Sequence, residues 1–145
     1  MEDIGAGPVA LDTSVFLYFI EDHAVYAPFV APIFEAMAGG RLQAVTSAVS
    51  LLEVLVVPYR NGHLAVAERY EALLHRSRGL RLCELDLPIL RGAAQLRALL
   101  PGLRTPDALQ VSTALLHRCR ALVTNDARLS TVSGLTVCQL NSYLP

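Results

Sequence analysis

Short runs of apolar residues alternate along the chain with longer segments in which apolar residues recur at helical spacing. The short runs predict β-strands at residues 9–11, 43–46, 80–85 and 121–124, with a last edge strand at residues 135–137. Between them, the pattern predicts helices over residues 13–19, 27–38, 47–59, 63–76 and 86–100, and a further helix from Thr105 onward. Because short apolar strands that alternate with helices are typical of parallel sheets, we expect an α/β fold with a central parallel sheet of about four or five strands.

Residues that favour the starts and ends of helices lie at several of these boundaries. Asp86 is placed to cap the helix that follows it, and Pro101-Gly102 stops that helix. We expect Thr105 at the cap of the next helix, with Pro106 at its first position. These signals support the division of the chain into alternating strands and helices.

The composition predicts a single domain that spans residues 1–145. A chain of 145 residues is long enough for a sizeable core, and this one contains no linker, low-complexity tract or internal repeat. Apolar residues make up 53% of the chain and the mean hydropathy is +0.42, which is high for a soluble protein. No apolar run reaches the roughly 18 residues that a membrane span needs. The first residues are acidic and unlike a signal peptide, so we expect a cytoplasmic protein that does not enter a membrane.

Charge and residue usage exclude several kinds of chemistry. The net charge of −1 provides no general basic surface for nucleic acid, although it is compatible with a local one. All 12 basic residues are arginines, which excludes mechanisms that need a lysine. Cys83, Cys119 and Cys138 are widely spaced beside apolar residues, which predicts buried thiols rather than a zinc or redox motif. The four histidines also lack metal-ligand spacing, and we expect them at the surface or at helix ends.

Four acidic residues lie beside or within apolar segments, namely Asp12, Glu53, Asp107 and Asp126. Burying an unpaired carboxylate costs several kcal/mol, so such a group is usually paired, protonated or bound to a metal. Asp12 and Asp126 follow two predicted strands, which places them at the carboxyl edge of the sheet, where such sheets bind ligands. If the fold gathers all four acids, Mg²⁺ or Mn²⁺ would remove their mutual repulsion, since hard cations prefer oxygen ligands.

Each acid also has an alternative interpretation that involves no ligand. Asp12 and Asp126 could cap the segments that follow them, and Asp107 could stabilise the first turn of a helix through its dipole. Glu53 is harder to explain in this way, because its helical neighbours are apolar and it lies away from both helix ends. Its evident local partner is Arg60, seven residues later, through a salt bridge.

Four segments, in this order, resemble the acidic motifs of PIN-domain ribonucleases, and most closely those of the VapC toxins of toxin–antitoxin pairs. They are Leu11-Asp12-Thr13-Ser14, residues 47–53, Thr105-Pro106-Asp107-Ala108-Leu109 and Leu122-Val123-Thr124-Asn125-Asp126. Each motif alone is weak evidence, but together they extend over nearly the whole chain at the spacing of the family. The resemblance implies a parallel sheet flanked by helices, with the acids at its carboxyl edge.

The resemblance also implies an activity, which is Mg²⁺- or Mn²⁺-dependent hydrolysis of RNA phosphodiester bonds by metal-activated water. Asp12 and Asp107 would be the principal metal ligands, and Glu53 and Asp126 would complete the acidic pocket directly or through water. Further candidate residues would support this site: Thr13, Ser14 and Thr124 as groups that orient water, Asn125 beside them, and Arg104 and Arg60 as phosphate-binding residues. Thr124 and Asn125 could equally serve only to end a strand, and both arginines could be solvated.

The resemblance implies partners as well, namely RNA as substrate, a small antitoxin whose C-terminal segment lies across the active-site groove, and a second copy of the chain. The apolar residues of 24–34 and 50–59 could supply such a partner surface, or belong to the core. Phosphoacceptor receiver domains and haloacid-dehalogenase-type phosphatases also place carboxylates at strand ends, but they normally use a lysine, which this chain lacks. The remaining alternative is a PIN-fold module that binds RNA or protein without cutting.

Overall fold

Five parallel strands form the centre of the fold, in the order β3-β2-β1-β4-β5. The strands are β1 (Val9–Leu11), β2 (Ala44–Ser47), β3 (Leu80–Cys83), β4 (Ala121–Thr124) and β5 (Thr136–Gln139). The structure, a computed structural model, describes residues 8–129 and 134–143. It confirms the predicted α/β fold with a parallel sheet of four or five strands.

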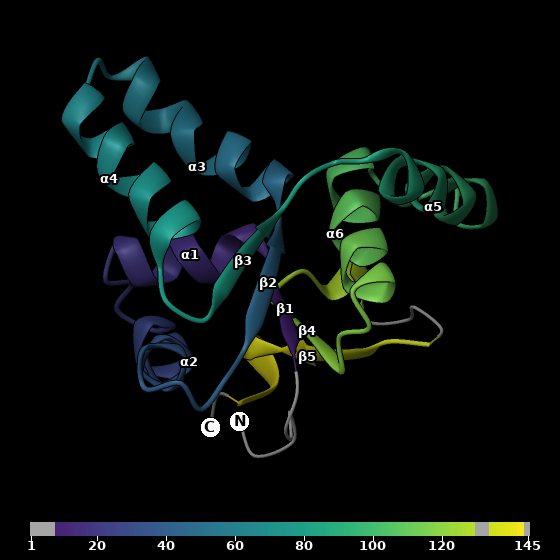
Figure 1. Cartoon of the computed structure of the whole chain (residues 1–145), viewed down its shortest axis with the longest axis horizontal. Coiled ribbons are helices and arrows are strands. Elements are labelled where there is room, and N and C mark those ends of the chain that lie inside the picture. The colour runs from purple at the N-terminus through teal and green to yellow at the C-terminus, as the bar shows by residue number, and fades with distance from the viewer. Residues whose placement is uncertain (1–7, 130–133, 144–145) are drawn as a thin grey trace.

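Helices cover both faces of this sheet and give the molecule three layers (Figure 1). The helices are α1 (Thr13–Ile20), α2 (Ala27–Ala38), α3 (Ala48–Arg60), α4 (Leu64–Arg76), α5 (Leu87–Leu99) and α6 (Thr105–Leu116), with the 3₁₀ helices η2 (Ala127–Leu129) and η3 (Leu140–Tyr143). Alternate residues of β1 serve the two layers, since Val9 and Leu11 pack towards α1 and α2 while Ala10 packs towards α5 and α6. Every residue of β1 is therefore buried, as expected for a central parallel strand.

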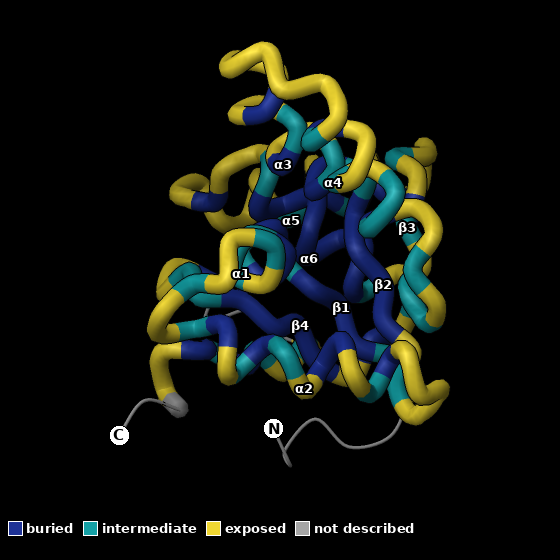
Figure 2. Tube along the Cα trace, turned by 90° about the vertical axis from the view of Figure 1, so that its left-hand side faces the viewer, coloured by how far each residue is buried: buried dark blue, intermediate teal, exposed yellow. Residues whose placement is uncertain are grey.

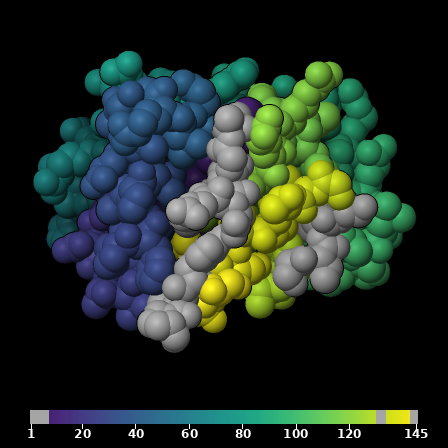
Figure 3. Space-filling view, turned by 90° about the horizontal axis from the view of Figure 1, so that it is seen from below, coloured from purple at the N-terminus to yellow at the C-terminus, as the bar shows by residue number. Residues whose placement is uncertain are grey.

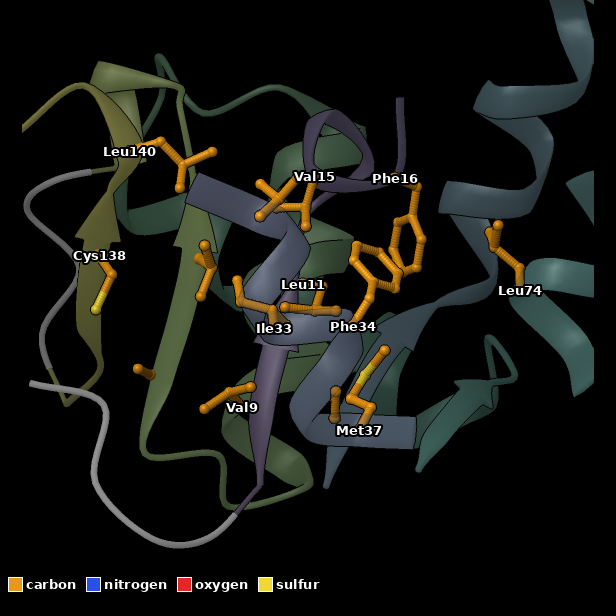
Figure 4. Packing of buried hydrophobic residues seen from close by; sticks show 14 of the residues in the cluster. Val9, Leu11, Val15, Phe16, Ile33, Phe34, Met37, Leu74, Cys138 and Leu140 are labelled. Carbon is orange, nitrogen blue, oxygen red and sulfur yellow. The ribbon is translucent and has the colours of Figure 1, made fainter. Parts of the chain in front are cut away.

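The core on the side of α1 and α2 is built around aromatic rings (Figure 4). The rings of Phe16 and Phe34 meet edge to face with their centroids 5.8 Å apart, and Phe19 stacks on Phe34 at 4.0 Å. Met37 and Leu74 are also almost completely buried in this cluster. Because each such side chain contributes about 1.5–3 kcal/mol by leaving water, this layer holds β1 and the start of α1 firmly in place.

Strand pairing determines where the observed strands end. β3 stops at Cys83 rather than at the predicted residue 85, because its neighbour β2 ends at Ser47, the partner of Cys83. β5 runs to Gln139 rather than to the predicted residue 137, because Gln139 still pairs with Thr124 of β4. The hydrophobic pattern of one segment does not reveal how long its neighbouring strand is, so the observed ends of β3 and β5 differ from the predicted ones.

Side chains cap the starts of α1, α3 and α5, whereas α2, α4 and α6 begin without a side-chain cap. Asp86 caps α5 as predicted, since its Oδ1 accepts a hydrogen bond of 3.1 Å from the backbone N–H of Ile89. The predicted cap of α6 is wrong by one residue, because Arg104 takes the extended cap conformation and Thr105 is already helical. Pro106 tolerates this shift, because a proline fits either of the first two helical positions, whose N–H groups lack partners inside the helix.

Helices α3 and α4 form a hairpin whose far end extends beyond the sheet into solvent (Figure 2). On α3, Val54 and Pro58 are buried, whereas Leu52, Val57 and Tyr59 are each more than half exposed. Residues 24–34 contribute Ala27, Val30, Ile33 and Phe34 to the core. Of the two apolar segments considered as partner surface, only the one on α3 presents a group of large apolar side chains to solvent.

On the lower face of the molecule, α2 and the C-terminal segment both reach the surface (Figure 3). They are joined by a hydrogen bond of 2.8 Å from the hydroxyl of Tyr26 to Oδ1 of Asn141. All three cysteines are buried thiols outside any disulfide, as predicted, and burial raises the pKa of Cys119 to about 11. Among the described residues, no helix is long and apolar enough to cross a membrane.

Candidate functional site

A pocket of about 400 Å³ at the carboxyl edge of the sheet contains all four predicted acids. The topology explains this arrangement, because β1 and β4 are parallel neighbours and the residues that follow them emerge at the same edge. Helices α3 and α6 begin at that edge and add Glu53 and Asp107. The lining residues are Asp12, Thr13, Ser14, Leu17, Tyr18, Glu53, Arg104, Asp107, Asn125, Asp126 and Ala127.

Asp12 both caps α1 and faces the pocket. One carboxylate oxygen accepts a hydrogen bond of 2.8 Å from the backbone N–H of Thr13, and the other accepts one of 2.6 Å from the Thr124 hydroxyl. Burial raises the pKa of the Asp12 carboxyl, and these two hydrogen bonds partly oppose that effect. The negative charges of Asp107 and Glu53 raise this pKa further. The capping and the pocket interpretations therefore both apply to Asp12.

Asp107 is the most buried of the four acids, with 7% of its surface exposed, in the first turn of α6. Its Oδ2 accepts a hydrogen bond of 3.1 Å from Nε of Arg104, whose side chain is 57% exposed. The other end of the same guanidinium, Nη2, lies 3.7 Å from Oδ2 of Asp126. Arg104 thus spans two acids and partly neutralises both.

Asp126 is held by a second arginine that sequence reasoning missed. Arg128 donates from Nε to Oδ1 at 3.0 Å and from Nη2 to Oδ2 at 2.7 Å, and its backbone N–H adds a bond of 3.0 Å to Oδ1. This side-chain pairing lowers the pKa of the Asp126 carboxyl below its ordinary value. The one sequence signal for the pairing was the two-residue spacing of an acid and an arginine just after a strand.

Glu53 differs from the expectation that it sits in apolar surroundings away from solvent. Its side chain is exposed, as are those of its neighbours Leu52 and Val56, so that stretch of the helix faces water. Its Oε1 accepts a hydrogen bond of 2.7 Å from the Thr13 hydroxyl. Within the described part of the chain Glu53 makes no salt bridge to Arg60, which lies about 10 Å further along α3 and does not line the pocket.

The remaining predicted residues have structural partners beside the pocket. Thr124 is fully buried and links two acids, since its hydroxyl donates to Asp12 and accepts from the backbone N–H of Asp126 at 3.0 Å. Asn125 donates from Nδ2 to the Tyr18 hydroxyl at 3.1 Å and accepts at 3.0 Å from the backbone N–H of Asn141. Both therefore hold the strand end as well as border the site.

Two hydroxyl groups of the first motif behave differently. The Thr13 hydroxyl is buried and hydrogen-bonded to Glu53. The Ser14 hydroxyl is buried too, yet it has no hydrogen-bond partner among the described residues. Since buried polar atoms are rarely left unpaired, the Ser14 hydroxyl still has a hydrogen to donate to water or a ligand.

A buried polar cluster beneath the pocket was not predicted from the sequence. Gln110 is 2% exposed, and its Nε2 donates to Ser50 Oγ at 2.7 Å and to Thr13 Oγ1 at 3.3 Å. Ser50 Oγ also lies 2.8 Å from Oγ1 of Thr46, which donates at 2.8 Å to the carbonyl of Leu11. A glutamine three residues after Asp107 on an apolar helix face was the available signal for this cluster.

The donor atoms that face the pocket are of the kind that hard cations prefer. Among the described residues, no three acidic, histidine or cysteine side chains lie close enough in these rotamers to hold one ion. Mg²⁺ commonly needs only one or two carboxylates, with water completing its octahedron. Asp12 and Asp107 fit that requirement, because each carboxylate oxygen keeps a lone pair beyond the hydrogen bonds described above.

Solved structures of toxin–antitoxin proteins share this fold. The VapBC2 complex of Rickettsia felis, bound to a DNA fragment from its promoter, superposes with a TM-score of 0.73 at 17% identity, over 92% of this chain and 98% of that chain. FitAcB from Neisseria gonorrhoeae gives a TM-score of 0.68 at 17% identity, over 94% and 99% of the two chains. VapC20 of Mycobacterium tuberculosis, a sarcin–ricin loop cleaving toxin, gives 0.62 at 13% identity, over 79% and 86%.

These likenesses concern the fold, since the identities are low. No curated protein sequence was found to match the chain. A family model described as PIN domain matches residues 9–135, a segment that includes all four acids and every described strand except the last. The predicted resemblance is confirmed by this match, and the chain belongs to the PIN domain family.

Proposed function

We propose that this chain is a Mg²⁺- or Mn²⁺-dependent endoribonuclease that hydrolyses RNA phosphodiester bonds, and the toxin of a toxin–antitoxin pair. The observation that carries the proposal is the pocket at the carboxyl edge of the sheet, where four acids from four sequence segments converge. Family membership and the fold shared with toxin–antitoxin proteins support the same conclusion.

The electrostatics of Asp12 supports a cation in this pocket. The carboxyl is buried, and its pKa is raised further by the charges of Asp107 and Glu53, so the ionised form is costly without a counter-charge. Asp12 and Asp107 would hold the ion, with Glu53 and Asp126 contacting it directly or through water. When bound, such an ion polarises a phosphoryl oxygen and lowers the pKa of water.

The residues of the pocket would orient the substrate and its attacking water. Arg104 is more than half exposed and offers guanidinium N–H groups at the rim, so it is suited to a backbone phosphate. The unpaired Ser14 hydroxyl is suited to position water or a phosphate oxygen. The Thr13 and Thr124 hydroxyls hold Glu53 and Asp12 in fixed orientations.

A protein partner fits the same proposal. Two structural relatives are complexes of the VapBC and FitAB type. We propose that this chain also binds a small antitoxin, and that the C-terminal segment of the antitoxin covers the acidic pocket. The exposed apolar side chains of α3 would supply the contact between two copies of the chain.

The decisive experiment compares two aspartates that both cap helices. Purified wild-type protein incubated with total RNA should cleave it with Mg²⁺ or Mn²⁺ and stop when EDTA is added. Asp12→Asn should lose at least 100-fold in rate, roughly the effect of removing one charge-stabilising group, while remaining folded. Asp86→Asn, which alters the cap of α5 away from the pocket, should retain full activity. Cleavage by Asp12→Asn at the wild-type rate, or cleavage that survives chelation, would contradict the proposal.

One observation favours the alternative of a PIN-fold module that binds without cutting. Arg104 and Arg128 already neutralise Asp107 and Asp126, so these two acids have counter-ions without any metal. Such a module would bind RNA equally with Mg²⁺ and with EDTA and would leave it intact in both. A gel-shift assay run beside the cleavage assay distinguishes the two functions.

A further inference from the structure

The floor of the pocket rests on four buried side chains that carry polar groups: Thr13, Thr46, Ser50 and Gln110. None is more than 7% exposed, and they come from α1, β2, α3 and α6. Buried polar groups of this kind need hydrogen-bond partners, and the available hydrogens have to be shared among the members. The way they are shared determines how firmly Glu53 is held.

The Thr13 hydroxyl has one hydrogen and two acceptors within reach. Glu53 Oε1 lies at 2.7 Å and Ser50 Oγ at 3.2 Å. Ser50 already receives a hydrogen from Gln110 at 2.7 Å, and it can pass its own hydrogen to Thr46, whose hydrogen is used by a backbone carbonyl. Because Ser50 is supplied from the other side, the Thr13 hydrogen is left for Glu53.

The orientation of the Gln110 amide follows from the same assignment of hydrogens to acceptors. An ionised glutamate only accepts hydrogen bonds, so Thr13 must donate to Glu53 and has no hydrogen for Gln110. The nitrogen end of the amide must therefore face the two hydroxyls, as it does at 3.3 Å from Thr13 and 2.7 Å from Ser50. An amide supplies two hydrogens at once, which neither a hydroxyl nor a carboxylate can do.

We propose that Gln110 is a positioning residue that directs the Thr13 hydroxyl onto Glu53 by satisfying Ser50. Glu53 lies on an exposed helix face, and within the described residues Thr13 is its one hydrogen-bond partner. Without Gln110, Ser50 and Glu53 compete for a single hydrogen, and the Glu53 side chain is released into solvent. The consequence for metal and RNA rests on the function proposed above, but the contact itself does not.

The test first removes the Gln110 amide as a donor and then removes the Ser50 hydroxyl, which competes with Glu53 for the Thr13 hydrogen. Gln110→Met keeps the length and volume of the side chain and deletes both hydrogens. In Gln110→Met/Ser50→Ala, the Thr13 hydroxyl again has Glu53 as its one nearby acceptor. Ser50→Ala alone is the matched control, since Thr13 keeps its bond to Glu53. Crystal structures of the four metal-free proteins and Mn²⁺ titrations of each provide the two measurements.

In metal-free Gln110→Met we expect Thr13 to turn towards Ser50 and Glu53 to lose its fixed rotamer. Mn²⁺ affinity should fall about tenfold, the lower end for removal of a residue that supports a metal ligand. Both properties should return in the double variant, which no general loss of packing would produce. A Thr13–Glu53 bond that persists in Gln110→Met, or a double variant no better than Gln110→Met, would overturn the proposal.

Two further outcomes keep the test decisive. If Gln110→Met does not fold, a neutron structure of the wild type locates the Thr13 hydrogen. A hydrogen directed at Glu53 supports the proposal, and one directed at Ser50 overturns it. If wild-type protein neither binds Mn²⁺ nor cleaves RNA, the proposed function fails, while the metal-free structures still decide the part played by Gln110.

Discussion

At the scale of single residues, Asp12 combines a structural and a chemical part in one carboxylate. It caps α1 through one oxygen and holds Thr124 through the other, yet its burial near Asp107 and Glu53 opposes ionisation. The same contacts that fix its position therefore leave it with an unfavourable charge. This conflict within one side chain leads to a stability prediction for the protein without metal.

We expect Asp12→Asn to raise the melting temperature of the metal-free protein. The folded-state pKa of Asp12 lies above its ordinary value of 3.8. The protonated carboxyl therefore stabilises the folded protein at low pH, and this stabilisation is lost as pH rises through the raised pKa. The difference between variant and wild type should therefore grow as pH rises from about 4 to 8 and reach about 2–4 °C, the shift that ~1 kcal/mol gives in a domain of this size. Thermal denaturation in EDTA across this range checks it, and a variant less stable at pH 8 would contradict it.

Arg104 leads to a second prediction at this scale, because its guanidinium binds the carboxylate that the proposed ion needs. Arg104→Gln should tighten Mn²⁺ binding severalfold, since both competition and charge repulsion are removed. The same substitution should weaken RNA binding if Arg104 also contacts a phosphate. Arg91→Gln on the exposed surface of α5 changes net charge equally and should alter neither property. Calorimetric titration with Mn²⁺ measures the difference, and unchanged affinity in Arg104→Gln would contradict it.

The sequence identified the residues of the pocket that come in recognisable local patterns, but not those defined by distant pairing. Asp12, Asp107 and Asp126 stand at element ends, where local signals place them. Gln110 is recognised by its bond to Thr13, 97 positions away, and by its bond to Ser50, 60 positions away. Local periodicity carries no information about such distant contacts. The exposure of Glu53 was missed for a similar reason, because it depends on which elements pack against that side of α3 in the folded protein.

At the scale of elements, the sheet order brings the site together while neighbouring strands set the boundaries. Strand and helix existence followed from apolar spacing, and every predicted element is present in the described residues. The shifted ends of β3 and β5 reflect the register with β2 and β4, which a single segment cannot reveal. Close helix packing is a further property of pairs of elements, as the contact between α5 and α6 shows.

Gly92 permits that contact. A Cβ at this position would lie 2.5 Å from Oγ of Ser112, which itself donates at 2.8 Å to the carbonyl of Ile89. Gly92→Ala should therefore destabilise the protein by about 1–3 kcal/mol in urea unfolding, despite the better helix propensity of alanine. In Gly92→Ala/Ser112→Ala the nearest remaining atom is Cβ of residue 112 at 3.6 Å, an ordinary contact. Gly92→Ala should therefore cost less stability in the Ser112→Ala background than in the wild type. Equal losses in the two backgrounds would contradict this explanation.

At the scale of the whole molecule, the α3–α4 hairpin projects beyond the sheet (Figure 2). Its helix α3 exposes several large apolar side chains to water. Apolar side chains that gather on an exposed surface commonly mark a contact surface. We expect the wild type to be a dimer in solution and Val57→Glu to be a folded monomer. Leu99→Glu, at a more exposed site on α5, should remain dimeric. Sedimentation equilibrium measures the three masses, and a monomeric wild type would contradict the prediction.

The order of the strands in the sheet has a consequence for how the protein is made. β1 precedes the other described strands along the chain, yet it lies between β2 and β4, and its pairing with β4 spans more than 100 residues. Contacts between such distant segments form late, after the entropy of a long loop has been overcome. Asp12 therefore lies beside an incomplete sheet until β4 and Asp126 have emerged from the ribosome. A chain that has not yet been extended through β4 therefore holds no complete acidic pocket, so the activity proposed above cannot begin until this strand is in place.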